Sequence, residues 1–68
     1  MIKTTIQIAR EAIERDLGNA IDNLTRAELT RDRNPQWVSG NGESIEAVVR
    51  GYRKHVLELQ LALLNLEE

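Results

Sequence analysis

Hydrophobic residues in the second half of the chain, over residues 44–66, recur every three or four positions, which is the period of an α-helix. At 100° per residue they fall on two different faces of that helix. The broader face consists of Ile45, Val48, Val49, Tyr52, Val56, Leu59, Leu63 and Leu66, and the roughly opposite face consists of Leu57, Leu61 and Leu64. A helix with two apolar faces needs two partners, and the rest of this chain supplies only one. We therefore expect a second copy of the protein to cover the other face.

The first half of the chain carries a single apolar stripe, which predicts a helix over residues 4–33. Thr4 and Gln7 have the spacing of a capping box, in which each side chain bonds the backbone N–H of the other residue, and Thr5 is the alternative cap. Ile8 and Leu29 lie off the stripe, where we expect contact with a partner chain. The stripe itself consists of Ile6, Ala9, Ile13, Leu17, Ala20, Leu24 and Ala27. Its alanines let a neighbouring helix approach closely.

A polar segment, residues 34–43, separates the two predicted helices. Pro35 disfavours the helical conformation in the residue before it, so the first helix should end there. Gly40 and Gly42 are suited to the positive φ angles of a tight turn. Ser44 is the expected N-cap of the second helix, over residues 44–66. The sequence therefore predicts one all-α domain, residues 1–68, folded as an antiparallel two-helix hairpin.

The chain has 68 residues and no cysteine. A domain of this size has a small core, and without disulfides the remaining source of stability is association between chains. We expect two hairpins to pair as a homodimer in a four-helix bundle, or as a tetramer if the second leucine face is not used up in the dimer. The predicted oligomer interface consists of Ile13, Leu17, Ala20, Leu24, Ala27, Leu57, Leu61 and Leu64.

Charged residues of both signs are interspersed along the chain, and the net charge is −2. This balance argues against a general polyanion binder. No apolar run approaches the roughly 18 residues of a membrane span, and the N-terminus lacks the apolar core of a signal peptide. We expect a cytoplasmic protein with no membrane contact. Acidic residues four positions before basic ones predict surface ion pairs between Glu11 and Arg15 and between Asp22 and Arg26.

Two features of the loop each allow a structural and a functional interpretation. The glycine-containing segment 38–44 leads into a helix N-terminus, where free N–H groups can bind an anion. A P-loop lysine is missing and Glu43 would repel an anion, so a tight turn at Gly40 and Gly42 is the better interpretation. Trp37 is either an exposed anchor for a protein partner or a plug over the end of the bundle. Because aromatic residues are so few here, the plug is the more economical interpretation.

A basic segment on the second helix gives the alternative function. Arg50, Arg53 and Lys54 could contact the phosphates of a nucleic acid, which would make the protein a nucleic-acid-associated regulator that uses residues 50–55. Glu46 and Glu58 lie four residues from Arg50 and Lys54, as in a solvated and internally paired helix surface. With a negative net charge, this pattern argues against nucleic acid as the partner. Arg50, Arg53, Lys54 and Trp37 are the predicted contacts to any further partner.

His55 is the only histidine, and Glu58 lies one helical turn away. The order His-x-x-Glu reverses that of carboxylate-bridged metal bundles, and further inward carboxylates are missing from the pattern. We therefore predict no metal site, no cofactor and no catalytic residue. The sequence favours a small self-associating helical protein that serves as a protein–protein interaction or assembly module.

Overall fold

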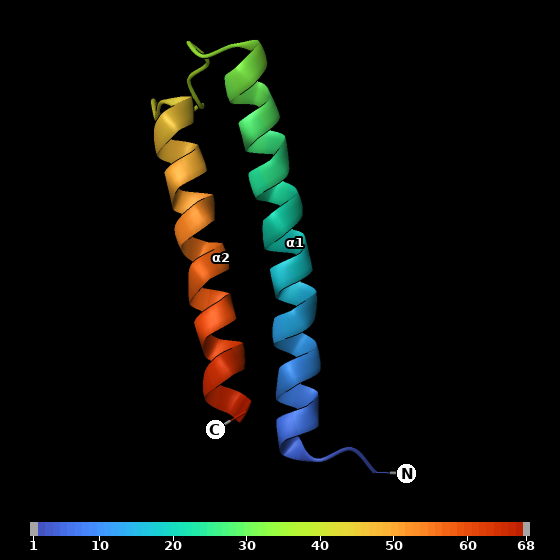
Figure 1. The fold of residues 1–68 in the computed structure, drawn as a ribbon. Helices are drawn as coiled ribbons and strands as arrows, with labels where there is room; N and C mark the ends of the chain where they lie inside the picture. Colours follow the sequence, from blue (N-terminus) through green and yellow to red (C-terminus); the bar gives the residue numbers. More distant parts are fainter. Residues whose placement is uncertain (1, 68) are drawn as a thin grey trace.

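The computed structural model describes residues 2–67, with the side chains of residues 2–66. Two helices, α1 (Thr5–Arg33) and α2 (Ile45–Glu67), run side by side in opposite directions and are joined by a loop (Figure 1). The hairpin measures 50 × 21 × 20 Å, and both ends of the chain lie opposite the loop. The predicted all-α two-helix hairpin is confirmed. The pairing of two hairpins into a four-helix bundle stays a prediction.

Local signals set the beginning of each helix. The Thr4 Oγ1 accepts a hydrogen bond from the Gln7 N–H at 3.1 Å, and the Gln7 Oε1 accepts one from the Thr4 N–H at 2.9 Å. This is the predicted capping box, and the alternative cap, Thr5, is the first residue of α1. At α2 the Ser44 Oγ accepts from the Ala47 N–H at 3.2 Å, as expected of an N-cap. Both helices therefore begin one residue after the cap that the sequence predicts.

The loop between the helices is held by its own backbone. The Trp37 carbonyl accepts a hydrogen bond from the Ile45 N–H at 3.1 Å, and the Glu43 carbonyl accepts one from the Ser39 N–H at 2.9 Å. These bonds close a short antiparallel bridge at the start of α2. Gly42 has φ +87° and needs the freedom of glycine, whereas Gly40 does not have a positive φ. The prediction of two positive-φ glycines is correct for Gly42 and wrong for Gly40.

The hairpin core lies where small residues of α1 meet β-branched residues of α2. Ala27 packs with Ile45 and Val49, and partly buried Leu24 and Val48 surround this cluster. Nearer the chain ends, Ala20 and Val56 are also buried. The alanines bring the two helix backbones close, as their alternation with larger residues predicts. The inward face of α2 is thus the broader of its two apolar faces.

Surface ion pairs differ in part from those predicted. Glu11 pairs with Lys3, at 2.8 Å between Nζ and Oε2. Among the side chains that the structure describes, neither of the predicted pairs, Glu11 with Arg15 and Asp22 with Arg26, comes within 4.0 Å. A long exposed side chain has several oppositely charged residues within reach, so spacing along one helix does not select its partner. Within the described residues, neither helix is long and apolar enough to cross a membrane.

Candidate interaction surface

The second apolar face of α2 is open in the hairpin. Leu57, Leu61 and Leu64 have exposed fractions of 55%, 59% and 58%, so more than half of each residue is in water. Their spacings of four and three residues place them on one stripe of the helix, turned away from the buried Val56 and Val49. An intact hairpin therefore leaves this stripe uncovered, as its spacing predicts.

An ion pair between the helices shows which side of α1 borders this stripe. The Arg53 Nη2 lies 3.4 Å from the Glu28 Oε2. Leu57 is one turn after Arg53, and Ile21 is two turns before Glu28, so both lie on the side of the hairpin that carries this ion pair. Ile21 is 44% exposed. We call the surface formed by Ile21, Leu57, Leu61 and Leu64 the leucine face.

Sequence reasoning missed Ile21, because it falls outside the main stripe of α1. The signal that could have found it is its position four residues after Leu17 and seven before Glu28, which puts it at the border of that stripe. Ile8 and Leu29, the two off-stripe residues that the sequence assigned to a partner, are exposed on other sides of α1. Neither adjoins the leucine face by helical position.

The residues of α1 that were assigned to the oligomer interface lie mainly in the contact with α2 of the same chain. Ala20 and Ala27 are buried there, with 2% and 6% of their surface exposed. They have almost no surface left for a second copy. Ile13, Leu17 and Leu24 are half-buried and keep some surface beside the leucine face.

Charge changes abruptly along the stripe of α2 that forms the leucine face. The half near the loop carries Glu46, Arg50 and Arg53, and the half near the chain ends carries the three leucines. All six side chains are exposed. The apolar surface is therefore confined to the half of the hairpin that is remote from the loop.

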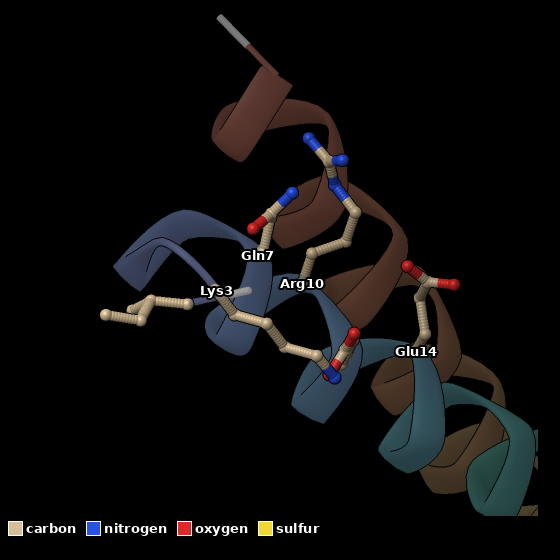
Figure 2. A pocket seen from close by; sticks show the side chains of 6 residues that line it. Lys3, Gln7, Arg10 and Glu14 are labelled. Atoms are coloured by element: carbon tan, nitrogen blue, oxygen red, sulfur yellow. The ribbon is translucent and has the colours of Figure 1, made fainter.

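A shallow hollow lies at the beginning of α1 (Figure 2). It is lined by Ile2, Lys3, Gln7, Arg10, Glu11 and Glu14. Figure 2 shows the Arg10 side chain extending toward the last turns of α2. The Arg10 Nε is buried and makes no hydrogen bond to a residue that the structure describes. The lining residues all come from the segment 2–14, and none of them is a serine, threonine, cysteine or histidine.

Trp37 stands between two hollows at the loop end. Both hollows are lined by Trp37, Val48 and Tyr52. One of them is also lined by Asn23, Arg26 and Thr30 of α1. The other is also lined by residues of the loop. Trp37 is 36% exposed. Trp37 thus borders the first turns of α2, where a plug would lie, and about a third of its surface is exposed.

The glycine-containing loop uses its amides internally. The Ser39 Oγ accepts hydrogen bonds from the N–H groups of Asn41 and Glu43, at 3.3 and 3.1 Å, and the Ser39 carbonyl accepts one from Gly42 at 2.9 Å. These are the donors that an anion would need. The geometry favours the tight-turn interpretation of the segment around Gly40 and Gly42.

The basic segment of α2 is partly paired within the chain. Arg53 contacts Glu28, and the Lys54 Nζ lies 4.0 Å from the Glu58 Oε1, as the spacing predicts. His55 is exposed. Within the described residues, no three His, Asp or Glu side chains come together in a way that could hold a metal ion. Binding of nucleic acid through Arg50, Arg53 and Lys54 stays a prediction.

No family model matches the chain, and comparisons with curated proteins and with solved structures give no significant match. Function is therefore inferred from the residues and their arrangement.

Proposed function

We propose that the protein is a self-associating helical module whose leucine face binds a second copy, so that two hairpins form a four-helix bundle. The observation that carries this proposal is the exposure of Leu57, Leu61 and Leu64 on one stripe of an otherwise charged helix surface. Contiguous exposed apolar surface of this kind marks a site of association. Such a module could serve in the cytoplasm as an assembly unit or as a platform for another protein.

The size of the hairpin supports the proposal. A chain of 68 residues in two helices has one line of contact between them and few fully buried side chains. Small domains of this kind gain stability when a second copy covers further apolar surface. The second apolar face of α2 offers that surface.

The exposed fractions give the expected strength of association. Complete burial of a leucine is worth about 1.5–3 kcal/mol, so covering the open part of each residue contributes about 1–2 kcal/mol. The four residues of the leucine face in two copies then contribute about 8–16 kcal/mol, an upper estimate. Association costs about 4–15 kcal/mol in lost translational and rotational freedom. The two quantities are similar, so we expect a modest affinity and a mass that depends on protein concentration.

The test is a pair of charge substitutions on exposed leucines. Leu61→Glu places a carboxylate in the centre of the leucine face and should convert the oligomer into a monomer. Leu29→Glu places the same charge at a leucine that is 48% exposed outside this face, and it should leave the mass unchanged. Light scattering measures the mass, and the far-ultraviolet circular dichroism verifies that both variants stay helical. An unchanged mass for Leu61→Glu would remove the leucine face from the interface.

A further inference from the structure

We infer that the leucine face of one copy packs on the same stripe of α2 in the second copy, with the two α2 helices antiparallel and the two loops at opposite ends. This inference rests on the proposed self-association and specifies its geometry. It follows from three features of the hairpin. These are the charged residues that α1 carries beside the leucine face, the distribution of charge along α2, and the charge at the end of α2.

The first feature decides which helix of the partner meets the leucines. Ala27 packs with Val49, and by the same antiparallel register Leu61 and Leu64 lie level with residues 12–15 of α1. On the side of Ile21, this part of α1 carries Glu14, and Arg10 lies one turn before it. If α2 lay on the partner's α1, the leucines would cover a carboxylate and a guanidinium, which is costly without matched partners. The leucine stripe of the partner's α2 covers the leucines without burying these charges.

The second feature decides the direction of the partner's α2. In a parallel pair each residue of the stripe lies opposite its own copy, so Arg50 faces Arg50 and Arg53 faces Arg53. Like charges directly opposite one another are destabilising. Glu28 already pairs with Arg53, and among the described ion pairs Arg50 has no carboxylate within 4.0 Å. The parallel arrangement therefore sets the Arg50 side chains of the two copies against each other.

The third feature favours the antiparallel direction. The last turn of α2 has no basic residue to offset the negative end of the helix dipole. When two α2 helices cross antiparallel about the midpoint between Leu57 and Leu64, Lys54, at the border of the stripe, lies level with the last turn of the other copy's α2. An ammonium group then lies near the negative end of a helix, and this occurs twice in a two-fold dimer. Leucine meets leucine at the centre, and the Arg50 residues of the two copies lie about 30 Å apart along the helix axes.

The antiparallel arrangement predicts a long distance between the two loops. Ile45 and Leu61 are sixteen residues apart, about 24 Å along the helix axis at 1.5 Å per residue. The two loops of an antiparallel dimer are therefore about 50 Å apart. In a parallel dimer the two loops lie side by side, and the distance between spin labels attached to them is within about 30 Å. This difference is large enough for one measurement to separate the two geometries.

The experiment uses single spin labels, which the absence of cysteine from the chain makes straightforward. One label is placed at Gly40→Cys, where a Cβ meets no atom within 4 Å and φ is not positive. The control label is placed at Asn65→Cys, an exposed site that lies near the centre of overlap and gives a short distance in either orientation. Pulsed dipolar spectroscopy then measures the label-to-label distances in the full-length protein.

The expected result is a distance of about 50 Å between Gly40 labels and a short distance between Asn65 labels. Short distances at both sites would overturn the antiparallel geometry and leave self-association intact. The absence of a defined distance at both sites, with a monomer mass, would refute the proposed self-association itself. The two failures are therefore distinguishable in one experiment.

Discussion

Ala27 gives the sharpest test of how closely the two helices approach. It packs against Ile45 and Val49, each of which is only 1% exposed, and Ala27 itself is 6% exposed. Ala27→Leu adds three carbon atoms to a side chain that is already almost fully buried against α2. The side chain must then adopt a strained rotamer, or the helices must separate and uncover both α2 residues. Overpacking of this kind costs about 1–3 kcal/mol.

That loss is a large part of the stability of the protein. At about 0.05–0.15 kcal/mol per residue, the free energy of unfolding of a chain of this length is about 3–10 kcal/mol. Urea unfolding is followed by circular dichroism at one fixed protein concentration. The urea midpoint of Ala27→Leu should be lower than that of the wild type by about 1 M or more. Ala12→Leu is the matched control at a half-buried position, and it should change the free energy of unfolding by less than about 0.5 kcal/mol. An Ala27→Leu protein as stable as the wild type would refute the close contact between α1 and α2.

Three further predictions concern the loop and the start of α2. Gly42→Ala should destabilise the protein by about 1 kcal/mol, because φ at Gly42 is +87°. Gly40→Ala is the control and should be neutral or slightly stabilising. Chemical unfolding gives the free energy of unfolding of each variant. Ser44→Ala removes the hydrogen bond to the Ala47 N–H and should cost about 1 kcal/mol, and an unchanged unfolding midpoint would mean that this cap contributes nothing. The emission maximum of Trp37 should lie at a shorter wavelength in the folded protein than in the unfolded protein, and acrylamide should still quench this emission. Identical folded and unfolded spectra would contradict the position of Trp37 beside α2.

Features that depend on neighbouring residues in one helix could be read from the sequence. The capping box of Thr4 and Gln7 needs only a spacing of three residues, and the structure has both of its hydrogen bonds. The inward and outward faces of α2 follow from the helical period in the same way. The antiparallel hairpin then follows from a short loop between two such helices.

Features that depend on contact between the helices could not be read in this way. Ile21 belongs to the leucine face because the Glu28–Arg53 pair sets which sides of α1 and α2 adjoin, and the sequence does not contain that register. Glu11 pairs with Lys3 from the segment before α1, which a pattern within the helix cannot foresee. Gly40 and Gly42 are equivalent as residue types, and only the path of the loop gives Gly42 the positive φ.

In the proposed dimer, a second copy of the chain covers the leucine face. The most direct test is the mass of the wild-type protein by light scattering across a dilution series, at low and at high salt. We expect a dimer that dissociates on dilution and persists at high salt, because burial of Leu57, Leu61 and Leu64 dominates the association. A monomer mass at every concentration would contradict the proposed dimer, because the leucine face would then stay open in the isolated protein.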